Sequence, residues 1–294
     1  MNADRFQASP DRSGDVSGRL PNRAMLVLEP KRGWASINPA EIWRYRDLLW
    51  ILVGRELKLR YKQTVLGVAW VILQPLTAAL IFAVIFGRFA HLPADGVPYL
   101  LFVFSGLTAW SYFAGAVQRA SNSLVANAQL ITKVYFPRML IPLAHTLAVL
   151  VDFAVMFAVL MVLMIIYRTA PTWRMFGMPL LLLLITLTAV GANLWLSALS
   201  VKYRDFMYVV PFLIQVWMFA SPVVYAASVI PQRWQMLYSL NPAAGFIEGF
   251  RWSILGRGSV TPGTFLITTG VSVFFFASGA YYFRRVEREF ADVI

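Results

Sequence analysis

Cysteine is missing from the 294 residues of this chain, and charged residues make up only 14% of them. The missing cysteine excludes a disulfide framework, a thiolate metal site and a cysteine nucleophile. The shortage of charge separates the chain from soluble domains, in which about 25% of the residues are charged. Because 59% of the residues are hydrophobic and several apolar runs reach the roughly 20 residues that cross a bilayer, we expect an integral membrane protein.

Motifs of common enzyme classes are missing as well. The sequence contains no Gly-x-x-x-x-Gly-Lys-Ser/Thr loop, which excludes nucleotide binding by a P-loop, and no Gly-x-Ser-x-Gly elbow of a serine hydrolase. Its two histidines, His91 and His145, are expected on opposite sides of the membrane core, where they cannot share a metal ion. We therefore expect no catalytic residue, no metal site and no enzymatic activity in this chain.

Long apolar runs recur along the chain. They predict an all-α integral membrane protein with six transmembrane helices, at about 64–87, 98–117, 139–167, 178–201, 208–227 and 262–283. Between the last two runs, at about 229–258, apolar and aromatic residues are mixed with Pro and Asn. A stretch with only about ten to fourteen apolar residues favours a re-entrant segment, so we expect a helical hairpin that dips into the outer leaflet.

The basic residues indicate an orientation. With the N-terminus in the cytoplasm, most of the 26 Lys and Arg residues fall before the first span or in inside segments, as the positive-inside rule requires. Both termini are then cytoplasmic, and the net charge of +12 needs no nucleic-acid partner. The residues up to about position 24 are polar, so we expect no cleavable signal peptide.

Two segments precede the spans. Residues 1–40 are rich in Arg, Asp, Ser, Gly and Pro, which predicts a disordered cytoplasmic tail. Residues 41–63 carry too many charges to span a membrane and predict an amphipathic interfacial helix. Its expected apolar side consists of Trp50, Val53, Leu57 and Tyr61, and its basic side of Arg55, Lys58 and Lys62. Residues 64–294 then form the transmembrane domain.

The inside loop at 119–138 carries more apolar residues than a plain loop needs, including a short amphipathic piece at 123–131. Apolar residues that face the cytoplasm lie on the membrane or contact a partner. Together with the basic side of the interfacial helix, this loop is interpreted as the docking surface for a soluble cytoplasmic subunit.

Asp152 lies near the middle of the third predicted span, where an ionised carboxylate costs about 2.5–3.5 kcal/mol. His145, two helical turns earlier, projects from nearly the same face. One hypothesis is a proton relay in an ion-coupled transporter, and the other is a buried hydrogen bond or ion pair between helices. We favour the second because a relay recruits several acids and the other spans offer none.

Polar and aromatic residues in the other spans leave two interpretations open. Gln74, Asn193 and Gln215 belong either to interhelical packing or to a hydrophilic pathway. Most aromatic residues are expected to face lipid, while a minority would stack on sugar rings inside a channel.

Five short motifs occur in order along the chain. They are the run 57–70 with Gln74-Pro75, then Tyr135-Phe136-Pro137-Arg138, Tyr203-Arg204-Asp205, Ser221-Pro222-Val223-Val224-Tyr225, and Asn241-Pro242 with Arg251. Together they resemble the permease subunits of type 2 ABC exporters, in particular the polysaccharide-export branch. The resemblance extends from about Trp43 to the C-terminus and leaves out the polar tail.

The resemblance implies a half-transporter that forms a homodimer in the bacterial inner membrane, with a channel at the dimer interface. It implies two copies of a separate cytoplasmic ABC ATPase, which bind ATP and Mg, whereas this chain itself would bind no cofactor. The implied substrate is an undecaprenyl-linked polysaccharide of the O-antigen, capsule or teichoic-acid type, which reaches the protein among membrane lipids.

Candidate site residues combine these patterns with the resemblance. The candidates for ATPase docking are Arg55, Lys58, Ser123, Asn127, Gln129, Lys133 and Tyr135. The candidates for binding the substrate or a lipid headgroup are Arg60, Tyr61 and Lys62, a basic cluster that anchoring to anionic lipid explains equally well. The channel-lining candidates are Trp70, Gln74, Phe82, Trp217 and Tyr225, and the gate candidates are Asn241, Pro242 and Arg251.

Two other functions stay open at this point. A drug or small-lipid exporter would use the same class of permease. A proton-coupled secondary transporter would depend on Asp152 and would work without ATP.

Overall fold

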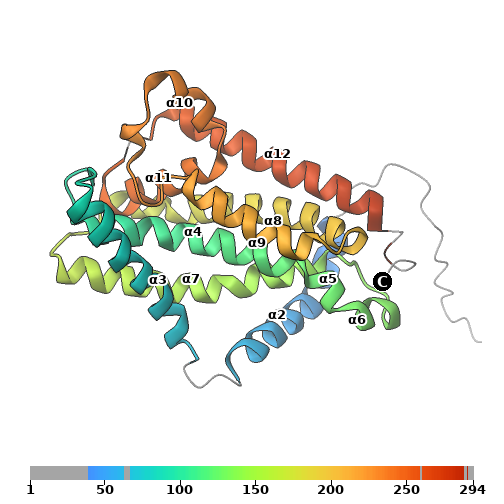
Figure 1. Cartoon of the computed structure of the whole chain (residues 1–294). Coiled ribbons are helices and arrows are strands. Elements are labelled where there is room, and N and C mark those ends of the chain that lie inside the picture. The colour runs from blue at the N-terminus through green and yellow to red at the C-terminus, as the bar shows by residue number, and fades with distance from the viewer. Residues whose placement is uncertain (1–38, 63–66, 259, 288–289, 291–294) are drawn as a thin grey trace, which may run out of the picture. The chain divides into compact units, whose positions relative to one another are not determined.

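All regular secondary structure in the described residues is helical (Figure 1). The computed structural model describes residues 39–62, 67–258, 260–287 and 290, which belong to the unit Ala35–Ile294. The predicted tail at 1–40 lies almost wholly outside the described residues, and so does the start of the first predicted span at 64.

The helices differ widely in length. The first half contains α1 (Pro39–Arg44), α2 (Arg46–Tyr61), α3 (Ala69–Phe82), the π-helical segment η1 (Ala83–Phe89), α4 (Tyr99–Ser121), α5 (Ser123–Ala126), α6 (Ala128–Lys133) and α7 (Leu140–Ile166). The second half contains the 3-10 helix η2 (Trp173–Gly177), α8 (Met178–Lys202), α9 (Phe206–Phe219), the 3-10 turn η3 (Ala227–Val229), α10 (Gln232–Ser239), α11 (Pro242–Leu255) and α12 (Pro262–Val286).

Five helical stretches in the described residues are long and apolar enough to cross a membrane. They are Ala69–Phe89, Tyr99–Ser121, Leu140–Ile166, Trp173–Lys202 and Pro262–Val286. Each overlaps one of the predicted spans, so an all-helical membrane protein with several spans is confirmed, because bilayer thickness sets the length of an apolar run.

The predicted fifth span, at 208–227, is shorter than expected. Its helix, α9, has 14 residues, and the segment after Phe219 leaves the helix as a series of turns. Pro222 explains this end, because proline has no N–H for the helix ladder and disfavours helical backbone at the residue before it. Tightly turned backbone follows, in which Val223 N donates to Ser221 O at 2.7 Å.

α4 is the central helix. It contacts α3, α7, α8, α9 and α11, and most of its side chains are buried on all sides. In Figure 1, α4, α7, α8 and α12 run side by side. A helix that is apolar nearly all round can be buried on every side, as α4 nearly is.

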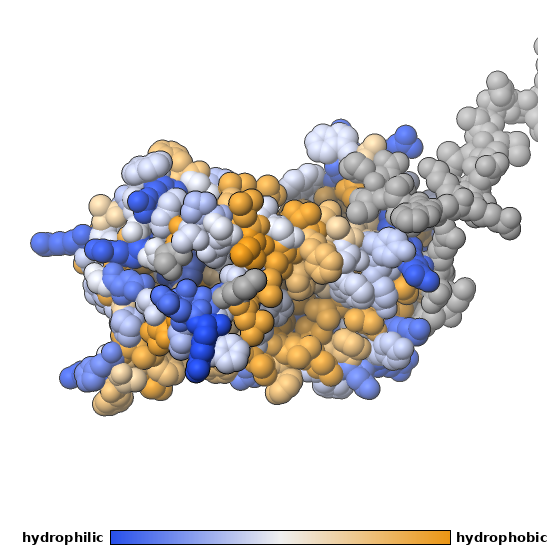
Figure 2. Space-filling model, turned by 90° about the horizontal axis from the view of Figure 1, so that it is seen from above, coloured by the Kyte–Doolittle hydropathy of each residue, from blue (hydrophilic) through white to orange (hydrophobic). Residues whose placement is uncertain are grey.

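Hydrophobic residues gather in the middle of the face drawn in Figure 2, with hydrophilic residues toward both ends. That distribution fits a body whose middle lies in a bilayer. α3 contributes little to the protein interior, since Ala79 is its one buried residue. Its exposed apolar side chains include Trp70, Leu73, Leu80 and Ile81. Such a face contacts lipid or another protein.

α8 and α12 approach each other most closely at two glycines. A Cβ added at Gly191 would lie 2.5 Å from Phe275 O and 2.5 Å from Phe276 N, and one added at Gly279 would overlap Gly191 O. Small residues of this kind let the backbones of membrane helices touch. Around the contact, Thr188 Oγ1 donates to Ser272 Oγ at 2.8 Å, and the rings of Trp195 and Tyr282 stack with centroids 4.1 Å apart.

α2 packs on α7 with a different side from the one that its sequence pattern predicts. Val53 is 6% exposed as expected, but Trp50, predicted to share its apolar side, is 64% exposed. Leu49, Leu52 and Val53 are the buried residues of this helix. The packed side continues through Glu56 and Arg60, which reach partners on α7, so the division into one apolar and one basic side is wrong in part.

Candidate functional site

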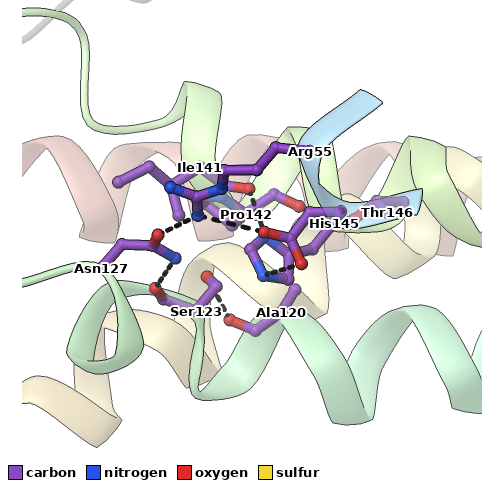
Figure 3. Close-up of polar contacts among 9 residues, drawn as sticks. Arg55, Ala120, Ser123, Asn127, Ile141, Pro142, His145 and Thr146 are labelled. Atoms are coloured by element: carbon purple, nitrogen blue, oxygen red, sulfur yellow. Dashed lines mark hydrogen bonds and ion pairs between the residues drawn. The ribbon is translucent and has the colours of Figure 1, made fainter. Parts of the chain in front are cut away.

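Polar side chains gather where α2 meets α5 and α7. We call this set the α2 junction. Its members are Arg55, Glu56, Arg60, Tyr61, Ser123, Asn127, His145 and Asp152. Figure 3 shows the part of it around Arg55, Asn127 and His145, where side chains from α2, α7 and the α5–α6 segment point toward one another.

Arg55 ties α2 to the segment between α5 and α6. Its Nη2 donates to Asn127 Oδ1 and lies 3.1 Å from Glu56 Oε1 (Figure 3). Asn127 Nδ2 donates to Ser123 O at 2.8 Å, and Ser123 Oγ donates to Ala120 O at 2.7 Å. Asn127 lies between α5 and α6, and its side-chain amide donates to the same Ser123 carbonyl that accepts a hydrogen bond from Asn127 N at 3.2 Å.

Glu56 and His145 form the second contact of the junction. His145 Nε2 lies 3.2 Å from Glu56 Oε2, and Nδ1 lies 3.0 Å from Ile141 O (Figure 3). A carbonyl oxygen only accepts, so Nδ1 carries a hydrogen. The Nε2–carboxylate contact is then an ion pair only when the imidazole is protonated.

Asp152 receives two groups from the end of α2. Arg60 Nη1 forms an ion pair with Asp152 Oδ2, and Tyr61 Oη donates to Asp152 Oδ1. The Arg60 and Asp152 side chains are only 20% and 10% exposed. Of the two hypotheses for Asp152, the ion pair between helices is the one present in the structure.

Tyr61 keeps its proton over the physiological range. Burial first, and then the hydrogen bond to Asp152, raise the pKa of its phenol from 10.0 to about 12. Because the pKa of Tyr61 is higher in the folded state, its phenol stabilises the folded protein in full below pH 10.0. This contribution is lost as the pH rises through about 12. The donor to Asp152 therefore does not titrate near neutrality.

The docking candidates fall into two groups. Ser123 and Asn127 are buried, and with Arg55 they hold the junction together. The other four candidates, Lys58, Gln129, Lys133 and Tyr135, are exposed, Tyr135 at 76%. This second group, together with the part of the Arg55 side chain that is exposed, offers side chains to a partner.

The headgroup candidates are likewise divided by the structure. Arg60 and Tyr61 are engaged with Asp152, whereas Lys62 is exposed. Lys62 is therefore the one of the three whose charge is directed to the surroundings, and the role of all three toward substrate stays a prediction.

The channel-lining candidates lie on two parts of the chain, α3 and the segment of α9 with the turns after it. Trp70 and Gln74 are exposed on α3, and Phe82, on the same helix, packs on Phe86 with ring centroids 5.9 Å apart. Trp217 and Tyr225 lie in or after α9. Trp217 meets the Phe113 ring edge-on, at 5.1 Å between centroids, and Tyr225 Oη accepts a 3.4 Å hydrogen bond from Tyr238 Oη.

Asn241 joins the end of α9 to the start of α11. As the N-cap of α11 its Oδ1 accepts from Ala243 N at 3.0 Å and from Trp217 Nε1 at 2.8 Å. Its Nδ2 donates to Ala220 O and to Ser221 Oγ, both at 3.1 Å. Pro242 follows at the first helical position, where its missing N–H costs nothing.

Arg251, the third gate candidate, is only 1% exposed. Its Nη2 donates to Val223 O at 2.6 Å, its Nε donates to Phe102 O at 3.3 Å, and its Nη1 pairs with Glu248 at 3.1 Å. Its Cζ lies 3.6 Å from the centroid of the Phe102 ring. The gate candidates thus bind α11 to α4 and to the turns after α9.

Two carboxylates of these sites are absent from the sequence-based candidates, Glu56 and Glu248. The i, i+3 spacing of Glu248 and Arg251 was an available signal for a helical pair. Glu56 carried no such signal, because its partner His145 lies on another helix. In the described part of the chain, no three His, Asp or Glu side chains gather where they could hold a metal ion.

The five candidate spans and the polar contacts between helices define a multi-pass membrane protein. It belongs to the ABC-2 type transporter family, whose sequence profile matches residues 47–255, from α2 to the end of α11.

Export permeases are similar to this chain over most of its length. The O-antigen export system permease protein RfbA of Klebsiella pneumoniae is 28% identical over 250 residues, which cover 84% of this chain and 95% of that protein. RfbA of Myxococcus xanthus is 28% identical over 256 residues, 86% of this chain and 98% of that protein. The polysialic acid transport protein KpsM of Escherichia coli is 24% identical over 226 residues, 76% of this chain and 84% of that protein.

Proposed function

We propose that this chain is the transmembrane subunit of an ATP-driven exporter that moves a lipid-linked polysaccharide, of the O-antigen or capsule type, across the bacterial inner membrane. The observation that carries the proposal is the similarity to O-antigen export permeases over 95% and 98% of their length.

The proposed topology has six crossings, with α9 as the fifth and both termini in the cytoplasm. α9 would cross together with the turns after it, which Asn241 and Arg251 hold in place. α2 would run from the inner membrane surface toward the level of Asp152 on α7, and α10 with α11 would form the outer re-entrant hairpin. Trp234, Leu237 and Leu240 are exposed apolar side chains of that hairpin, which suits the outer leaflet.

Two copies would form the channel along α3 and α9. Both helices leave large apolar or aromatic side chains exposed, among them Trp70, Ile81, Tyr208 and Phe212. In a homodimer these faces would line and surround the path, and aromatic rings would stack on sugar rings. The substrate would be an undecaprenyl-linked polysaccharide, drawn from the membrane.

The energy source would be a separate ATPase subunit, two copies of which bind ATP and Mg. Its docking surface on this chain would be the exposed part of the α5–α6 segment with the neighbouring side of α2. Gln129, Lys133, Val134 and Tyr135 are exposed there, a mixture of apolar and basic groups that favours protein contact.

Tyr135→Ala is expected to weaken binding of the ATPase subunit by about 2 kcal/mol, the size of an aromatic hot-spot contact. The measurement is co-purification of the ATPase with the tagged permease, followed by titration in detergent. Arg168→Asp changes an exposed residue of the α7–α8 connection and is expected to bind normally. Equal binding by Tyr135→Ala and wild type would place the docking surface elsewhere.

Deletion of the gene, with complementation, tests the function itself. We expect loss of surface polysaccharide and accumulation of its lipid-linked form inside the cell, both restored by the wild-type gene. Unchanged surface polysaccharide, with a new sensitivity to drugs, would favour the drug or small-lipid exporter instead.

A further inference from the structure

We propose that Arg60 and Asp152 act as one positioning pair, which fixes α2 to α7 so that the two helices move together during transport. The inference rests on the proposed function, because it assigns the pair a part in ATP-driven movement. Neither residue is assigned a role as a substrate ligand or as a proton carrier.

The cost of each charge explains why both are present. Asp152 sits at the middle of a 27-residue candidate span, where an unpaired carboxylate is expensive. Arg60 is also largely covered. The two charges neutralise each other, and Tyr61 donates a hydrogen bond to the second carboxylate oxygen of Asp152. Removal of Arg60 would take the ion-pair partner from Asp152 and leave only the charge of Arg119 on α4 to act on it, and removal of Asp152 would leave Arg60 and Arg119 as neighbouring like charges, so losing one partner is more damaging than losing both.

The position of the pair makes it suited to hold α2 at a fixed angle. The buried apolar contacts of α2 are Leu49, Leu52 and Val53, all in its first half. In the second half, Leu57 is only partly buried, and the polar contacts to α7 are Glu56 to His145 and Arg60 with Tyr61 to Asp152. Polar partners of this kind accept only one register, whereas apolar side chains can slide past one another.

A chain of contacts leads from the pair to the outer hairpin. Phe153, the residue after Asp152, meets Tyr112 of α4 at 5.6 Å between ring centroids and Phe250 of α11 at 5.9 Å. Phe250 adjoins Arg251, whose guanidinium holds the turns after α9. Displacement of α7 by α2 would therefore act directly on the helices that carry the gate candidates.

Charge exchange tests the pair. The variants are Arg60→Asp, Asp152→Arg and the double variant with both. We expect each single reversal to lower export about tenfold, or more, while the ATPase continues to hydrolyse ATP, because two like charges then face each other and repel, which separates α2 from α7. The exchanged pair is expected to recover most of the export. A proton relay at Asp152 predicts instead that the exchanged protein stays inactive.

A cross-linking readout requires neither export nor the ATPase. The natural chain has no cysteine, so Glu56→Cys with His145→Cys places a single pair between α2 and α7. In this background a short bis-maleimide is expected to cross-link α2 to α7 efficiently. We expect a much lower yield when Arg60→Asp or Asp152→Arg is added alone. The yield is expected to recover when both are added together. Arg168→Asp, a charge reversal at an exposed residue beyond α7, serves as the matched control and leaves the yield unchanged.

The two readouts separate the inference from the proposed function. If the cross-link follows the charge pair but no polysaccharide is exported, the contact is right and the transported substrate is wrong. If the exchanged pair restores neither the cross-link nor export, the positioning role is overturned. Normal export by Asp152→Asn would overturn it as well.

Discussion

Gly191→Leu is expected to prevent accumulation of the folded protein. A side chain at this position would run into the backbone of Phe275 and Phe276 on α12, whereas in most overpacked sites the obstacle is a side chain that can rotate away. Overpacking typically costs about 1–3 kcal/mol when the surroundings can adjust. We expect more than about 3 kcal/mol here, because α8 and α12 would have to separate along the most extensive helix contact of the fold.

Gly270→Leu is the matched control for this prediction. Gly270 lies on the same helix, α12, and a Cβ there meets no atom within 4 Å. Fluorescence-detected size exclusion and thermal unfolding in detergent compare the two variants. We expect a monodisperse peak and a nearly normal unfolding temperature only for Gly270→Leu. Equal stability of both variants would contradict the backbone contact.

Arg251→Met is expected to destabilise the protein by about 3–5 kcal/mol, the range for a buried pair that loses one partner. The methionine retains much of the length and apolar contact but leaves Glu248, Phe102 O and Val223 O without their donor. The turns after α9 would lose their attachment to α11 at this end. Arg257→Met, at an exposed arginine just beyond α11, is expected to unfold at the wild-type temperature.

The pH dependence of Arg251→Met gives a second readout. Burial raises the pKa of Glu248 above its usual 4.5, and Arg251 opposes that rise. Without Arg251 the pKa rises further, so the folded state holds the proton more tightly than the unfolded state does. The variant is therefore most stable at low pH and loses stability as the pH rises through the folded-state pKa. A larger decrease in unfolding temperature from acidic to alkaline pH than in wild type checks the sign.

The spans were predictable because one physical quantity, the thickness of the bilayer, sets their length and composition. The ends of α4, α7 and α12 therefore fall close to the predicted boundaries. α9 was the exception. Hydropathy alone predicts a helix that continues past Pro222, whereas the helix ends at Phe219 because Pro222 disfavours helical backbone before it.

The partners of the charged residues were not predictable in the same way. Arg60 reads as one member of a basic cluster, and only the fold brings it to Asp152 on α7. Arg251 donates to two backbone carbonyls. Every residue has a backbone carbonyl, so the residue types cannot indicate which ones Arg251 binds. Trp50 is a prediction that failed for the same reason. Periodicity predicts it on the buried side of α2 with Val53, but the polar partners on α7 determine which side of α2 is packed, and Trp50 is exposed.

Transport in proteoliposomes tests the central claim most directly. The permease is reconstituted with its ATPase subunit, and a lipid-linked polysaccharide with a labelled glycan is placed on the ATPase side. We predict that the glycan becomes protected on the opposite side only when ATP and Mg are present and the ATPase is active. Movement without ATP hydrolysis, or ATP-dependent movement of small lipids with no movement of the glycan, would contradict the account.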